Sequence, residues 1–124
     1  MDATKELALA QVAQYFRALS VPMRLRILDA LRQGERCVGD LAAQVGRSQA
    51  NVSQHLAILA NAGLLVRNAR GTSAYYAIAD PCTFALCELV CGQIGRRFAD
   101  EASVRAMFPP AGTGLDPDAG PEDS

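Results

Sequence analysis

The sequence predicts a mainly α-helical chain with one small β-hairpin, an α+β fold in the order helix, helix, helix, helix, strand, strand, helix. Apolar residues recur at spacings of three and four along most of the 124 residues, which is the period of an amphipathic helix. Between Gly63 and Asp80 the period falls to two on either side of a polar segment, which is typical of a hairpin. At this length we expect one domain, over residues 1–108.

Two helices joined by a very short link form the centre of the predicted fold. The first has an apolar stripe made of Val38, Leu41, Ala42 and Val45. It ends at Gly46, a residue that tolerates the left-handed backbone of a helix end. Because only Gly46 and Arg47 separate the two helices, they must cross steeply, as in a helix-turn-helix.

The second helix of the pair, residues 48–61, has an apolar face and an uncharged polar face. Val52, Leu56 and Leu59 share the apolar face, and Ser48 is placed to cap the first turn. The outer face carries Ala50, Asn51, Ser53, Gln54, Ala57, Ile58 and Asn61. Small residues beside amides and hydroxyls suit close approach to base edges in a DNA major groove. An uncharged surface helix without this role is the alternative.

The predicted hairpin has a basic tip. Its apolar strand residues are Leu64, Val66, Tyr75, Tyr76 and Ile78, on either side of a turn over residues 68–73. Arg67 and Arg70 lie where they would contact phosphate or the minor groove. A hairpin in this position is a wing, so the sequence predicts a winged helix-turn-helix.

Two helices are expected before this unit. The first covers residues 4–19, with the apolar stripe Leu9, Val12, Phe16 and Leu19. The second begins at a Ser20 cap, carries Pro22 in its first turn and runs to Gln33. Its core-facing residues are Met23, Ile27, Leu28 and Leu31, whereas Arg24, Arg26 and Arg32 are expected to face solvent or to pair.

One helix is expected after the hairpin, from Pro81 to Ala99 with Asp80 as its cap. An apolar seam at spacings of three and four consists of Phe84, Cys87, Cys91, Ile94 and Phe98. A second apolar face consists of Leu86, Leu89 and Val90. With one face on its own chain and the other on a partner, this helix and the first are predicted to form a homodimer interface. The alternative is a doubly buried helix in a monomer.

Charge is unevenly distributed along the chain. The net charge is −1, but residues 109–124 contribute four acids and no base in a Pro- and Gly-rich segment, which we expect to be a disordered acidic tail. Without those four acids, 12 bases face 9 acids, so the rest carries about +3. That charge is mild for a nucleic-acid partner, and two copies would be needed to accumulate phosphate contacts.

The chain shows neither a signal peptide nor an apolar run of the ~20 residues that a membrane span requires. We therefore expect a cytoplasmic protein, in which the four cysteines are thiols rather than structural disulfides. Cys87 and Cys91 lie one turn apart on one helix face, and a two-fold partner would bring the same pair close. Cys82 is out of phase and would be a third ligand, and simple core packing is the alternative for all of them.

The chain resembles the ArsR/SmtB family of winged-helix repressors over roughly residues 10–98. The matching segments, in order, are LSVPMRLRILDAL, GERCVGDLAAQVGRSQANVSQHLAILANAGLL and RNARGTSAYYAIADP. The resemblance implies a homodimeric DNA-binding repressor that responds to a metal or to thiol chemistry.

The ligand sets known in that family match only in part. Its arsenic sensors carry Cys-x-Cys where this chain has Cys37-Val38-Gly39, so only the first thiol is present. Its zinc and cobalt sensors place Asp and His ligands on the last helix, where this chain has Cys82 after Asp80-Pro81, and Gln93 and Arg96 at the later His positions. A thiolate site is therefore expected, for As(III), Sb(III), Cd(II) or Pb(II).

The predicted function is a sequence-specific repressor of an inverted-repeat operator that a soft metal or metalloid releases. The predicted DNA contacts are Arg47, Ser48, Gln49, Asn51, Ser53, Gln54, Arg70 and Thr72, and the predicted metal ligands are Cys87, Cys91 and Cys82, with Cys37 less favoured. DNA binding itself is expected to need no cofactor. The alternatives are a redox- or reactive-sulfur-responsive repressor and a DNA-binding module without an inducer. We expect no enzyme, because no nucleophile lies with a base and the one histidine, His55, fits a packed position.

Overall fold

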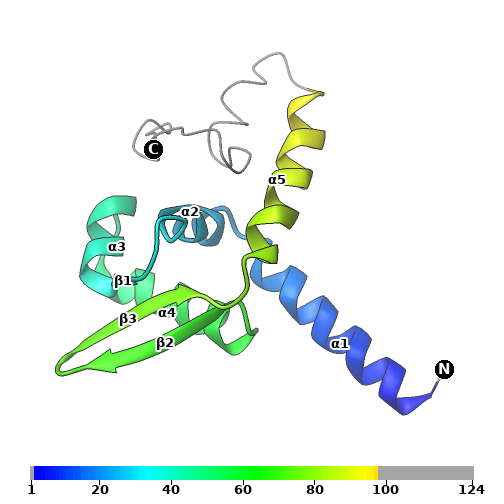
Figure 1. Ribbon diagram of the computed structural model, residues 1–124, viewed down its shortest axis with the longest axis horizontal. Helices are drawn as coiled ribbons and strands as arrows, with labels where there is room; N and C mark the ends of the chain where they lie inside the picture. The colour runs from blue at the N-terminus through cyan, green and yellow to red at the C-terminus, as the bar shows by residue number, and fades with distance from the viewer. Residues whose placement is uncertain (1, 98–124) are drawn as a thin grey trace. The chain divides into compact units, whose positions relative to one another are not determined.

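The computed structural model describes residues 2–97. Its elements follow the predicted order with one addition (Figure 1): α1 (Ala3–Ala18), α2 (Pro22–Ala30), β1 (Arg36–Cys37), α3 (Val38–Val45), α4 (Gln49–Asn61), β2 (Leu65–Arg70), β3 (Ser73–Ile78) and α5 (Cys82–Gly95). The mainly α fold with a small hairpin is confirmed.

The chain divides into two compact units, Met1–Asp80 and Pro81–Ser124, and α5 is the described part of the second. The predicted domain end at residue 108, the tail 109–124, and the seam residue Phe98 lie outside the described residues.

The addition is β1, which the sequence analysis missed. It pairs antiparallel with β3, with Arg36 opposite Tyr76 and Cys37 opposite Tyr75, so the sheet has the order β1-β3-β2. A two-residue strand carries no period that a sequence pattern can reveal. Its consequence is that the loop before α3 is fixed to the wing.

Two helix starts differ from the prediction. Val21 is the N-cap of α2, and the Ser20 hydroxyl instead donates 2.7 Å back to the carbonyl of Arg17. Pro22 does lie in the first turn, where its missing N–H leaves no bond unmade. In the second unit, α5 begins at Cys82 with Pro81 as N-cap in helical conformation and no side-chain capping bond, so Asp80 is not the cap.

The core of the first unit is built from the predicted apolar stripes. Its largest fully buried apolar side chains are Ile27, Leu28, Leu31, Leu41, Val52, Leu56, Leu59 and Leu64. These side chains come from α2, α3, α4 and the start of the hairpin, which pack on one another. Met23 is only half-buried, at the edge of this core.

The stripe of α1 is different, because most of it stays exposed. Leu9, Val12 and Phe16 are 49–52% exposed. Three large apolar side chains in helical register on a solvent face are unusual for a monomer and typical of a surface that a partner covers.

No helix within residues 2–97 has the length and apolar content to cross a bilayer.

The turn between α3 and α4 gives a test of the fold. Gly46 has φ +72° and ψ +38°, and an added Cβ would meet no atom within 4 Å, so only the backbone conformation opposes a side chain. We expect Gly46→Ala to lower the free energy of unfolding by about 1–2 kcal/mol. Gly39→Ala is the matched control, because Gly39 lies inside α3 and its Cβ would make an ordinary 3.6 Å contact with Gln49. That control should be neutral or raise stability by up to ~1 kcal/mol in urea unfolding. Equal losses in the two variants would contradict a left-handed turn.

Candidate nucleic-acid interface

The rotation of α4 about its axis is fixed by its apolar stripe. Val52, Leu56 and Leu59 are all 0% exposed, and α4 packs against α2, α3 and β2. The opposite side is therefore held in solvent, and its exposed residues are Ala50, Ser53, Gln54, Ala57, Ile58 and Asn61. Asn51 is half-buried at the edge of this face. An uncharged face of small and amide side chains thus points outward, as predicted.

The start of α4 combines a cap with a basic side chain. The Ser48 hydroxyl oxygen accepts a 3.1 Å hydrogen bond from the backbone N–H of Asn51, which confirms the predicted cap. Its own O–H hydrogen is still available to donate to an acceptor such as a phosphate. Arg47 and Gln49 are exposed beside it, and Arg47 Nη1 donates to the neighbouring Gly46 carbonyl at 3.3 Å. Donors and the positive end of the helix dipole therefore converge on one surface.

The wing is longer and tighter than expected. The strands pair from Leu65 opposite Ile78 to Arg70 opposite Ser73, so only Gly71 and Thr72 form the turn. The prediction of a loop over residues 68–73 was wrong, because those polar residues continue the pleat at an exposed edge. Gly71 has φ +60° and no other residue near it has positive φ, as in a type II′ turn, which matches the twist of a hairpin.

A carboxylate ties the wing to the loop before β1. Glu35 accepts from Arg70 Nη2 at 2.6 Å and from the Asn68 amide at 3.1 Å. The Arg70 guanidinium also lies over the Tyr75 ring, 4.6 Å from its centre. The hydrogen bond from Asn68, together with that from Arg70 and the Arg70 charge, lowers the pKa of Glu35. Arg70, one of the predicted DNA contacts, is thus already paired with Glu35, an acid that was not among the predicted functional residues.

Behind α4 lies a buried arginine. Arg24 is 8% exposed, so it does not face solvent as predicted, and among residues 2–97 it has no acidic partner. Its Nε donates to the carbonyl of Ala18 at 2.7 Å and its Nη2 to that of Arg17 at 3.4 Å. These carbonyls close the end of α1, where a cation is favoured. Arg32, in contrast, does pair, with Asp29 at 3.5 Å.

The third partner of Arg24 is His55 of α4, whose Nδ1 lies 3.4 Å from Nη1. Since a guanidinium can only donate, Nδ1 must accept, and the ring proton is assigned to Nε2. Burial and then the Arg24 charge lower the pKa of His55. The only histidine in the sequence is therefore half-buried with a hydrogen-bond partner, as expected.

The predicted ligands are not gathered into a site within one chain. Cys87 is buried, Cys91 half-buried and Cys82 exposed, all on α5, whereas Cys37 is a half-buried residue of β1. Within residues 2–97, no three His, Cys, Asp or Glu side chains lie close enough together to hold a metal ion.

Comparison with known proteins agrees with the family resemblance that the sequence segments indicated. The family model "Bacterial regulatory protein, arsR family" matches residues 22–66, from α2 into the wing. The regulator CmtR of Mycobacterium bovis is 43% identical over 88 residues, which cover 70% of this chain and 75% of CmtR. The chain belongs to the ArsR family. The regulator NmtR of Mycobacterium tuberculosis is 45% identical over 73 residues, and the match covers 59% of this chain and 61% of NmtR, less than two thirds of its length.

Solved structures of transcriptional regulators have the same fold. The homodimeric winged helix-turn-helix DNA-binding domain of Mb0332 from Mycobacterium bovis superposes with a TM-score of 0.71 at 34% identity, covering 80% of this chain and 94% of that domain. The antimony-specific transcriptional repressor AntR superposes with a TM-score of 0.65 at 36% identity, covering 78% of this chain and 88% of AntR. The resemblance inferred from three sequence segments is confirmed over most of the fold.

The contact between Glu35 and Arg70 makes a prediction about affinity for DNA. Glu35→Gln removes the charge that neutralises Arg70 and leaves an amide of the same shape, so Arg70 becomes available to a phosphate. We expect binding to any duplex to tighten severalfold, and the slope of log affinity against log salt to steepen by about 0.9 for the one additional phosphate contact. Fluorescence anisotropy over a salt series measures both quantities.

The control is the double variant Glu35→Gln with Arg70→Gln. If Glu35 acts through Arg70, the gain disappears when Arg70 is absent, and the two substitutions are not additive. An equal gain in both backgrounds would mean that Glu35 repels DNA directly rather than by holding the wing arginine.

Proposed function

We propose that this chain is a homodimeric transcriptional repressor that reads an inverted-repeat operator with α4 and the wing. We further propose that a soft metal or metalloid bound by thiolates of α5 releases it from DNA. The single observation that carries DNA readout is the outward face of α4, which is uncharged, amide-bearing and held in place by a fully buried stripe. Such a face offers hydrogen bonds to base edges at close approach.

Each predicted DNA residue has a place in this proposal. Gln49, Asn51 and Gln54 would meet bases in the major groove, together with Arg47. Ser48 and Ser53 would donate to phosphates, and Arg70 and Thr72 would reach the backbone or minor groove from the wing. These contacts come from one helix and one hairpin, so a single copy reads a single half-site.

A homodimer is supported by the exposed stripe of α1, Leu9, Val12 and Phe16, and by Leu89 (73% exposed) and Val90 (48% exposed) on α5. Two copies related by a two-fold axis would read half-sites about one helical turn apart, ~34 Å. Sedimentation that finds only single chains at DNA-binding concentrations would contradict this part of the proposal.

The thiol part rests on the spacing of Cys87 and Cys91, one helical turn apart on α5. Thiolates select soft ions such as As(III), Sb(III), Cd(II) and Pb(II). The relative AntR is described as antimony-specific, which fits a soft metalloid as inducer. Since one chain gathers no three-ligand cluster within residues 2–97, the thiols of a second copy, with Cys82 as a further candidate, would complete the site.

Base readout is tested with Gln54→Ala. Loss of an amide that bonds a base should weaken operator binding by about 1–3 kcal/mol, roughly 5- to 150-fold, while binding to random duplex changes less than twofold. Asn61→Ala is the matched control, because Asn61 is an exposed amide at the far end of the same face. Equal losses on operator and random DNA would rule out base readout by Gln54.

The inducer is tested by following operator binding under reducing conditions while adding As(III), Cd(II) and Zn(II) in turn, and then a persulfide or a peroxide. We expect As(III) or Cd(II) to weaken operator binding at least tenfold, and Cys87→Ser or Cys91→Ser to abolish this response. Cys37→Ser should leave it intact. A response only to the oxidants would favour a redox switch on the same thiols, and no response at all would leave a DNA-binding module without a thiol effector.

A further inference from the structure

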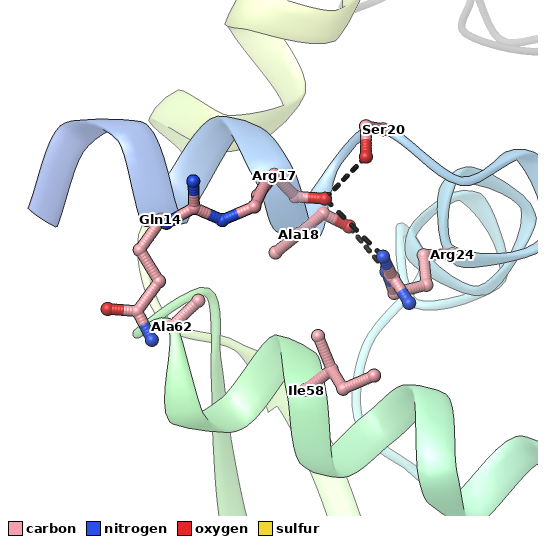
Figure 2. A pocket seen from close by; sticks show the side chains of 7 residues that line it. All are labelled: Gln14, Arg17, Ala18, Ser20, Arg24, Ile58 and Ala62. Carbon is pink, nitrogen blue, oxygen red and sulfur yellow. Dashed lines mark hydrogen bonds between the residues drawn. The ribbon is translucent and has the colours of Figure 1, made fainter. Parts of the chain in front are cut away.

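An open cavity of about 340 Å³ lies at the surface of the first unit, where the end of α1, the α1–α2 link and the second half of α4 meet (Figure 2). Seven residues line it: Gln14, Arg17, Ala18, Ser20, Arg24, Ile58 and Ala62. Its volume falls within the range of small-molecule sites, about 300–1,000 Å³. The predicted DNA contacts on α4 end at Gln54, and the cavity is lined by Ile58 and Ala62, one and two turns further along the chain.

The wall of the cavity is positively charged and holds no acid. Arg17 and Arg24 both line it, and no Asp or Glu does. The ion pairs that the described residues make elsewhere, Asp29 with Arg32 and Glu35 with Arg70, do not involve either arginine. Two arginines therefore line one small space, and neither has a carboxylate partner in the described part of the chain.

Arg24 is fixed in this wall rather than mobile. Its Nε and Nη2 bond carbonyls of α1 and its Nη1 faces His55, so the guanidinium is held from three sides. A guanidinium has five N–H donors, so these three contacts leave others unassigned. A buried charge is costly unless an opposite charge or strong acceptor offsets it, and carbonyl dipoles offset only part of the cost.

The other residues of the cavity add a movable donor and an apolar side. Figure 2 shows the Arg17 side chain extending along the rim beside Gln14, with Ala62 and Ile58 on the opposite wall. Both Arg17 and Gln14 are exposed, so they can adjust to a ligand. Ala18, Ile58 and Ala62 offer methyl groups and no hydrogen bonds.

We propose that this cavity is a binding site for a small organic carboxylate with a short apolar body. The carboxylate lies between the Arg17 and Arg24 guanidinium groups, where a planar fork matches two oxygens. The apolar body lies against Ala18, Ile58 and Ala62. The site uses none of the cysteines, so it is separate from the thiol chemistry proposed above.

Occupancy of the cavity has a consequence for DNA binding. A ligand held by Arg17 on α1 and by Ile58 and Ala62 on α4 connects the exposed stripe of α1 to the recognition helix. If the ligand favours one placement of α1 over another, it changes operator affinity, and operator DNA changes ligand affinity by the same factor.

The test uses the full reduced chain without DNA, so that it does not depend on the proposed function. Benzoate is titrated by ¹⁵N–¹H NMR, with benzamide as the neutral compound of the same shape. We expect benzoate to bind with Kd of about 1 mM or tighter, as a ligand of this size allows. Amide shifts should concentrate around residues 14–24 and 58–62, and benzamide should bind at least tenfold more weakly.

Variants locate the site. Arg17→Gln removes an exposed charge and should weaken benzoate at least fivefold, whereas Arg67→Gln, which removes an exposed charge on the wing, should change it less than twofold. Ala62→Leu fills the cavity and should abolish binding in a chain whose spectrum remains folded. Equal binding of benzoate and benzamide, shifts confined to other residues, or equal effects of the two arginine variants would each overturn the site.

Discussion

The candidate nucleic-acid interface depends on one packing constraint, the complete burial of Val52, Leu56 and Leu59 along one side of α4. A helix with three fully buried positions at spacings of four and three cannot rotate without exposing apolar surface, at a cost of about 1.5–3 kcal/mol for each side chain. The uncharged outer face is therefore presented in a single orientation. Gly46 sets where that helix begins, because its left-handed backbone lets α4 start with only three residues between it and the end of α3.

Arginines complete the ends of helices throughout the first unit. Arg24 donates to the last carbonyls of α1, and Arg36 Nε donates 3.0 Å to the carbonyl of Ala30 at the end of α2. Each contact spans six or seven residues of sequence and joins a helix end to the element that follows it. Arg24 also contacts His55 of α4. Its guanidinium therefore connects α1, α2 and α4. The end of α1 is thereby coupled to the helix proposed to read DNA.

The spacing of apolar residues and the types of residue at helix ends predicted the features that they determine directly. The buried stripes of α2, α3 and α4, the Ser48 cap and the Gly46 helix end were all readable, because spacing and residue type determine them locally. The role of Arg24 could not be predicted from the sequence. A charged residue inside a helical pattern gives no signal for burial until its carbonyl partners from another helix are known. The strand β1 and the contact from Glu35 to the wing depend on pairing across the sheet, which no local pattern encodes. For the same reason the sequence could name α5 thiols as candidates but not show what surrounds them.

The distribution of charge limits how this protein can achieve specificity. The outer face of α4 has no charged residue after Arg47, and Glu35 already neutralises Arg70. Few cations therefore remain for phosphate contacts on each copy, so the electrostatic part of binding, which is the same for every sequence, is small. In the proposed function, such a protein would gain its affinity from base contacts and from the presence of two copies. Under the proposed function, any input that changes how the two copies are held would change binding to an inverted repeat more than binding to random DNA, because only the inverted repeat requires both half-sites to be met at once.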